Sequence, residues 1–281
     1  MVGPELSYCA QQLRRLDPDR YLTALFAPDR RREGLFALYA FNLEVARARE
    51  AVREPMMGLI RLQWWRDALE EIYAGRPRAH EVVSALAAAI DEHRLEHRLF
   101  QRLIEAREQD MQPDPPADLP ALQRYAEETS STLVELALSV LGQPTAEVRE
   151  AGRAVGIAWA LAGLLRALPF HAAQRRVYLP AAMMADAGLT PTMLFDRRSS
   201  PALAEVARAV AAKAREALAA GRRHPGQVPR RFQPALLPAT LADGYLRRLA
   251  ASGYDPFDAR VQLAPPGRIW TLALRRVVGG Y

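Results

Sequence analysis

The sequence of 281 residues contains one cysteine, Cys9, and one lysine, Lys213. No apolar run approaches the ~20 residues of a membrane-spanning helix, and the longest, 156–165, ends at Arg166. The single cysteine excludes an internal disulfide framework and fits either a reducing compartment or a protein that is indifferent to redox conditions. The N-terminal segment lacks the apolar core of a signal peptide. We therefore expect a cytoplasmic protein whose contact with any membrane is peripheral.

Signals of β-structure are missing as well. There is no period-two alternation of useful length, no Asn-Gly hairpin turn and no internal repeat. Apolar residues instead recur at steps of three and four, which predicts an all-α protein. The proline-rich loop 112–116 is too short to separate domains, so residues 1–281 are expected to form one helical domain. The expected helices are 5–16, 19–26, 29–54, 56–73, 81–90, 95–111, 119–141, 145–168 and 201–223, with short helices around Met183 and Met193 and two or three more pieces toward the C-terminus.

The charge balance favours one sign. The net charge is +6 and comes almost wholly from arginine, which could favour phosphates or anionic lipid head groups. The basic residues are dispersed among acidic ones, however, so an arginine-biased genome explains the excess equally well. No glycine-rich phosphate loop, nucleophile elbow or zinc-ligand pattern is present, and we expect no metal site built from such motifs.

The segment Phe36–Glu50 carries the first candidate site. On a helix, Asn42, Ala46 and Glu50 would form one polar stripe with Arg47 beside it, and this stripe has a single carboxylate. Leu38–Phe41 followed by such a stripe resembles the squalene/phytoene synthase family, the head-to-head prenyl synthases. In that family the stripe carries aspartates that hold Mg²⁺ against a substrate diphosphate. By this resemblance the aspartate positions fall on Ala46, Arg47 and Glu50.

The segment Gly152–Pro180 resembles the second aspartate-rich region of the family through Leu164–Arg166 and Val177–Pro180. The resemblance places the two expected aspartates on Ala167 and His171, and Pro169 is expected to kink the helix between them. The same helix has a stripe of small residues, which predicts either close approach of a neighbouring helix or the floor of a cavity for a prenyl or acyl chain: Gly152, Gly156, Ala160, Gly163 and Ala167.

The resemblance extends over nearly the whole chain. It implies an isoprenoid-synthase-like helical bundle around a central cavity. Four phrases resemble one divergent branch, which acts in the assembly of respiratory complex I and is thought to have lost the synthase reaction: Asn42–Glu44, Met57–Trp64, Tyr125–Thr129 and Leu165–His171. Membership of that branch implies subunits of this membrane complex as partners, and a location in the cytoplasm or mitochondrial matrix, peripheral to the inner membrane.

Physical chemistry favours the loss of catalysis independently of the resemblance. Ionising an allylic diphosphate builds negative charge that Mg²⁺ neutralises, and Mg²⁺ requires carboxylate oxygens. Glu50 opposite His171 cannot hold such a cluster, and Arg47 adds a permanent cation. We therefore expect no catalytic residues, no bound metal and no cofactor. The alternative is an active, Mg²⁺-dependent prenyl diphosphate synthase with unusual ligands.

A third hypothesis is a lipid-binding protein. Arginines near the two motifs could hold a diphosphate or phospholipid head group directly, without metal, although each one is also explained by a solvated or ion-paired helix face. Arg166 lies in an apolar helix and is expected to need a partner. The C-terminal Arg268–Val278 reads as a basic amphipathic helix, which is typical of membrane surfaces but also of a last core helix. The candidate anion-binding residues are Arg47, Arg49, Arg61 and Arg166.

Overall fold

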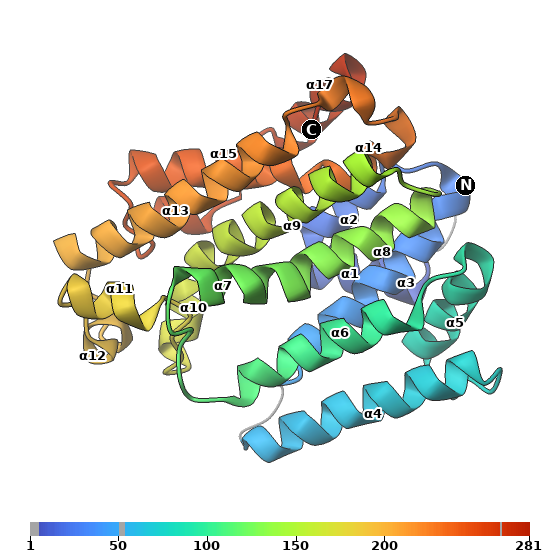
Figure 1. Ribbon diagram of the computed structural model, residues 1–281, viewed down its shortest axis with the longest axis horizontal. Helices are drawn as coiled ribbons and strands as arrows, with labels where there is room; N and C mark the ends of the chain where they lie inside the picture. Colours follow the sequence, from blue (N-terminus) through green and yellow to red (C-terminus); the bar gives the residue numbers. More distant parts are fainter. Residues whose placement is uncertain (1–5, 51–53, 265) are drawn as a thin grey trace.

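The computed structural model describes residues 6–50, 54–264 and 266–281, and its regular elements within these ranges are helices (Figure 1). The all-α prediction is confirmed. The helices are α1 (Tyr8–Leu16), α2 (Pro18–Ala24), α3 (Asp29–Ala46), α4 (Pro55–Tyr73), α5 (Glu81–His93), α6 (His97–Glu108), α7 (Leu119–Ala126), α8 (Thr132–Leu141), α9 (Ala146–Arg166), α10 (Leu168–Ala173), α11 (Ala181–Asp186), α12 (Pro191–Phe195), α13 (Pro201–Gly221), α14 (Gln233–Leu236), α15 (Pro238–Ala251), α16 (Ala259–Gln262) and α17 (Arg268–Val278).

Helix α9 occupies the middle of the bundle. It packs against α13 and α15 on one side and against α7 and α8 on the other (Figure 1). Thr145 begins the helix as its N-cap, because its hydroxyl accepts a hydrogen bond from the Val148 backbone N–H at 3.4 Å. Helix α3 packs in turn against α1, α5 and α8, so the two segments that carry the family motifs both lie in the interior.

Helices α7 and α8 form one continuous rod, joined by a single π-helical segment, η2 (Glu127–Ser131). The prediction of one helix over 119–141 is therefore confirmed in its extent, although the sequence does not indicate the π turn. Such turns carry one extra residue and often occur at functional sites. Here Thr129 and Ser130 of η2 lie in the wall of a cavity that is open to solvent.

The small residues of α9 serve both purposes that the sequence left open. A Cβ on Gly156 would lie 2.4 Å from the Cα of Ser131, so this glycine permits close contact between α9 and η2. A Cβ on Gly163 would meet no atom within 4 Å, because the helix faces a cavity there. The stripe is thus a packing surface in its first half and a cavity wall in its second half.

No helix within the described ranges combines the length and the apolar character needed to cross a bilayer.

Candidate functional site: an arginine-rich cavity

A cavity of about 690 Å³ lies where α2 begins and where α3 and α9 end, with further walls from η2, α10, α15 and the segment leading into α17. The structure brings both predicted motif regions to this cavity, as the resemblance implied. Five of the predicted residues line it: Arg47, Glu50, Arg166, Ala167 and His171. The predicted positions Ala46, Arg49 and Arg61 lie outside the lining.

The first motif region departs from the expected helical stripe. Helix α3 ends at Ala46, and Arg47–Glu50 form a turn, so the prediction of a continuing helix was wrong over these four residues. The part of the prediction that covers 51–53 lies outside the described residues. The turn places Ala48 fully in the core, which the sequence does not signal because no glycine or proline precedes it. Glu50 Oε2 lies 3.5 Å from Arg47 Nε. Burial raises the pKa of the Glu50 carboxyl, and Arg47 opposes this shift.

The second motif region also differs from expectation. Pro169 does not kink α9, because α9 ends at Arg166 and Pro169 lies in the first turn of the separate helix α10. This position needs no backbone donor from proline. The His171 ring of α10 packs against the Tyr178 ring in a tilted arrangement, with a centroid distance of 4.5 Å and an interplanar angle of 48°. Burial, with Arg176 beside it, lowers the pKa of His171 to about 4, so the imidazole is neutral at physiological pH.

Asp19 is the centre of a buried network that the sequence analysis missed. Its Oδ2 accepts hydrogen bonds from Arg166 Nη1 at 3.1 Å and from the Tyr245 hydroxyl at 2.7 Å. Its Oδ1 accepts one from Arg268 Nη1 at 2.5 Å. The Arg166 guanidinium also lies over the Tyr245 ring, 4.2 Å from its centroid. The expectation that Arg166 needs a partner is confirmed, and the partner is the carboxylate of Asp19, 147 residues earlier in the sequence.

A second network surrounds Asp110, next to the His171 wall. Its Oδ1 accepts hydrogen bonds from the hydroxyls of Tyr125 at 2.7 Å and Tyr178 at 2.9 Å. Arg107 Nη1 donates to the Tyr125 oxygen at 2.8 Å and lies 3.4 Å from Asp110 Oδ2. Burial raises the pKa of both tyrosines, so each hydroxyl remains a donor. The network fixes the wall against which His171 packs.

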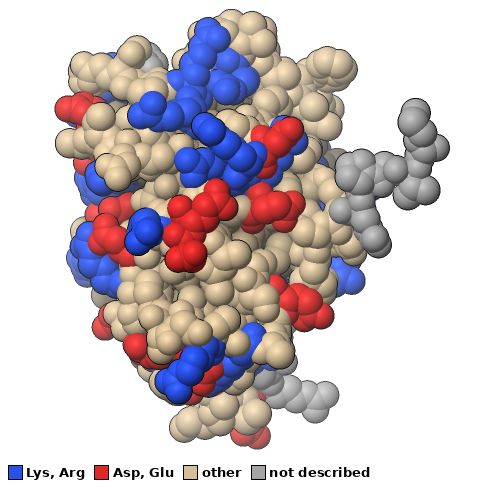
Figure 2. Space-filling model, turned by 90° about the vertical axis from the view of Figure 1, so that its right-hand side faces the viewer, with Lys and Arg blue, Asp and Glu red and all other residues tan. Residues whose placement is uncertain are grey.

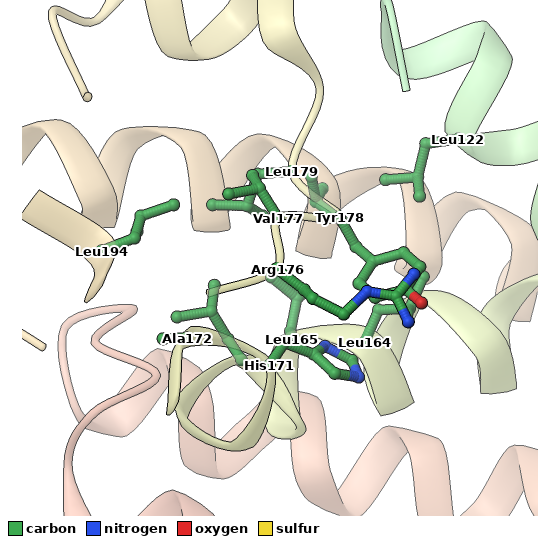
Figure 3. Close-up of a pocket in the computed structure, with 12 residues that line it drawn as sticks. Leu122, Leu164, Leu165, His171, Ala172, Arg176, Val177, Tyr178, Leu179 and Leu194 are labelled. Carbon is green, nitrogen blue, oxygen red and sulfur yellow. The ribbon is translucent and has the colours of Figure 1, made fainter. Parts of the chain in front are cut away.

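A small apolar pocket lies behind this wall. Figure 3 shows His171, Arg176 and Tyr178 at one side of it and leucines around the rest. The space measures about 10 Å³, close to the minimum for one water molecule. It is too small for an organic ligand. The 690 Å³ cavity is the candidate site because both motif regions line it.

The large cavity has a polar and an apolar part. Leu43, Trp159, Ala160, Gly163 and Leu164 contribute the apolar lining. In the polar part, two buried donor atoms have no hydrogen-bond partner within the described residues: Arg107 Nε and Ser130 Oγ. A wall with both characters matches an amphiphile that has an anionic end.

The donor set does not fit the Mg²⁺ cluster that the fold implies. Among the described residues, three carboxylates line the cavity, and each is paired with arginine: Asp17 with Arg20 at 2.7 Å, Asp19 with Arg166 and Arg268, and Glu50 with Arg47. Both oxygens of Asp19 already accept hydrogen bonds. The described residues contain no group of three or more acidic, histidine or cysteine side chains that could hold a metal ion. Mg²⁺ prefers oxygen ligands, and a paired arginine competes with it by charge.

The bundle, its central cavity and its two motif walls define a helical protein of the isoprenoid-synthase kind. Residues 13–266 match the family model described as squalene/phytoene synthase, and the chain belongs to this family. The crystal structure of the squalene synthase HpnC from Alicyclobacillus acidocaldarius has the same fold, with a TM-score of 0.77 and 22% identity over 88% of this chain and 94% of that one.

Two curated relatives point to different activities. The human protein named NADH dehydrogenase (ubiquinone) complex I, assembly factor 6 is 30% identical over 255 residues, which cover 91% of this chain and 77% of that protein. The presqualene diphosphate synthase of Rhodopseudomonas palustris is 26% identical over 262 residues, which cover 92% of each chain.

Proposed function

We propose that the chain is a non-catalytic member of the squalene/phytoene synthase family that acts in the assembly of respiratory complex I. It would work beside subunits of that complex, in the cytoplasm or in a mitochondrial matrix and peripheral to the inner membrane. The similarity to the human assembly factor over most of both chains supports this proposal.

The observation that carries the proposal is the pairing of every described cavity carboxylate with an arginine. Head-to-head prenyl transfer needs the diphosphate to leave with metal ions bound to it. Arginine pairing removes the oxygens that would hold those ions. The fold is that of a synthase, and a cavity of about 690 Å³ remains available for a ligand.

Deletion of the gene in its native host tests the proposal. We expect NADH:ubiquinone oxidoreductase activity and the amount of assembled complex to fall, while squalene and phytoene levels stay unchanged. Re-expression of the wild-type chain should restore the complex. Normal levels of complex I in the deletion strain would contradict the proposal.

A head-to-head prenyl diphosphate synthase is the second candidate, favoured by the similarity to the R. palustris enzyme. Purified protein incubated with farnesyl or geranylgeranyl diphosphate and Mg²⁺ separates the two functions. A non-catalytic chain gives no coupled product, whereas presqualene diphosphate or a coupled hydrocarbon would establish the transferase. An active prenyl synthase run in parallel confirms that substrate and metal are competent.

The cavity is proposed to bind an anionic amphiphile without metal. Arg47 and Arg166, two of the predicted anion-binding residues, line it, and the unpartnered donors Arg107 Nε and Ser130 Oγ lie in the same wall. The other two predicted residues, Arg49 and Arg61, lie outside the lining, and Arg61 pairs with Glu44 at 3.4 Å. Guanidinium groups bind phosphate oxygens directly, so such a ligand would need no Mg²⁺.

A further inference from the structure

Helix α17 (Arg268–Val278) has an apolar face that points away from the protein. Its inner side is held by Leu272, which is fully buried, and by Arg276, whose Nη1 donates to Gln233 Oε1 at 2.7 Å. Trp270 is 80% exposed, and the other apolar residues of the outer face are each more than half exposed. The spacing places these side chains on one helical face: Trp270, Leu274, Val277 and Val278.

An outward face of this kind is unusual for a last core helix. Scattered exposed apolar side chains are ordinary, whereas a contiguous row that includes a tryptophan marks an interaction surface. Since the buried residue Leu272 already fixes α17 to the bundle, packing against the core does not account for the outer row. Helix α17 therefore presents apolar side chains to solvent as well as to the core, unlike a helix that only covers its own protein.

The surroundings of this face are basic. Segments 217–242 and 259–281 contain no aspartate or glutamate, and each contains four arginines. The two segments lie together, because Arg222 Nε donates to the Tyr281 carbonyl at 2.7 Å and Arg230 Nη2 to the Val277 carbonyl at 3.4 Å. The carboxylate Asp243 reaches this region, where it pairs with Arg222 and Arg247.

The space-filling view agrees with this distribution. Figure 1 places α17 at the top of the molecule, and on the side face seen in Figure 2 basic side chains gather toward the same end, with acidic ones mostly below. The start of α4 is a contrasting surface, because its exposed apolar residues have acidic neighbours. Met56 and Ile60 are exposed there, Glu54 precedes Met56 in the sequence, and Glu44 pairs with Arg61 next to Ile60. Exposed apolar residues and an arginine-rich surround coincide at α17, although Arg222, Arg260 and Arg268 of this surround pair with aspartates.

We propose that the outer face of α17 docks onto the head-group layer of an anionic lipid bilayer. Tryptophan is favoured at the boundary between head groups and acyl chains, and arginines beside an apolar face bind lipid phosphates while their stems cover apolar surface. A projecting helix needs no complementary pocket in a fluid bilayer, whereas a protein partner would have to supply one. Arg268 and Gln262 also line the central cavity, so docking brings one cavity wall to the membrane.

Co-sedimentation of the full chain with vesicles tests this proposal. We expect the wild type to pellet with vesicles of phosphatidylcholine and phosphatidylglycerol, less with phosphatidylcholine alone, and less at high salt. The double variant Trp270→Ser, Leu274→Ser should bind roughly tenfold or more weakly, because large apolar side chains no longer enter the interface. Charge neutralisation by Arg275→Gln should weaken binding to the anionic vesicles only.

The matched control is Met56→Ser, Ile60→Ser, which removes two comparably exposed apolar residues from α4 and should leave binding unchanged. Thermal unfolding of both double variants should match the wild type, since all four side chains are exposed. Equal binding to neutral and anionic vesicles, or full binding by the α17 variant, would overturn the proposal. Absence of vesicle binding would also overturn it, in favour of a protein interface. None of these outcomes depends on whether the chain acts in the assembly of complex I, so the two proposals can fail separately.

Discussion

Asp19 and Arg166 form an ion pair at 3.1 Å across the cavity wall, although 147 residues separate them in the sequence. The same carboxylate holds Arg268 of the last helix. One acidic side chain thus joins α2, α9 and α17, and both of its oxygens already accept hydrogen bonds from arginine or tyrosine.

Asp19→Asn is expected to lower the free energy of unfolding by about 2–3 kcal/mol. The substitution leaves Arg166 and Arg268 without their counter-charge in a largely buried place, and removing one partner of a buried pair is costly. Urea denaturation measures the change. Asp29→Asn, in an exposed pair with Arg32, is the control and should cost less than about 1 kcal/mol.

The double variant Asp19→Asn, Arg268→Gln should lose less stability than the sum of its single variants, because the pair is removed together. Strict additivity would contradict an energetic coupling between α2 and α17.

Gly156→Ala and Gly163→Ala should have opposite effects, although both lie on α9. The methyl group on Gly156 would lie 2.4 Å from Ser131 Cα, so the backbone of η2 must move, at a cost of about 1–3 kcal/mol. The methyl group on Gly163 projects into the cavity, and the higher helix propensity of alanine should stabilise the protein by up to ~1 kcal/mol. Thermal unfolding compares the two, and equal destabilisation by both would contradict the assigned packing.

Stability should fall as the pH is lowered, in part because of His171. The folded-state pKa is lowered from 6.5 to about 4, so between these values the unfolded chain binds a proton that the folded chain does not. Protons therefore favour unfolding, and this contribution grows as pH falls below 6.5 and levels off near 4. His171→Gln should reduce the loss of unfolding free energy between neutral and acidic pH by roughly 2 kcal/mol. An unchanged pH slope in urea titrations would show that the imidazole is not shielded.

Arg47→Gln should weaken binding of a non-reactive farnesyl diphosphate analogue several-fold, while Arg61→Gln should leave it unchanged. The two arginines are similarly exposed and each pairs with a glutamate, but only Arg47 lines the cavity. Isothermal titration calorimetry in the presence of EDTA measures the affinity without metal. Loss of wild-type binding on adding EDTA would contradict a direct arginine contact and favour a metal-dependent site.

Most helices could be predicted from the sequence, because their apolar residues recur at three- and four-residue steps and proline or capping residues mark several ends. Pro55 lies in the first turn of α4, and Thr145 and Ser200 cap α9 and α13. The end of α3 could not be predicted, because no local signal precedes Arg47 and the turn depends on packing of Ala48 in the core.

The cavity could be predicted only in outline. The resemblance located its two motif walls, and the structure places Arg47 and His171 in them. The Asp19 network escaped prediction because its partners are distant in sequence and become neighbours only in the fold. The Asp110 network had one available signal, the Val177–Pro180 phrase, but this phrase does not indicate what the Tyr178 hydroxyl contacts.

The link between Asp19 and Arg268 also constrains how the chain matures during synthesis. A nascent chain that has not yet emitted α17 from the ribosome can satisfy Asp19 only through Arg166 and Tyr245. The wall that Arg268 contributes to the cavity can therefore form only after residue 268 has been synthesised and has left the ribosome.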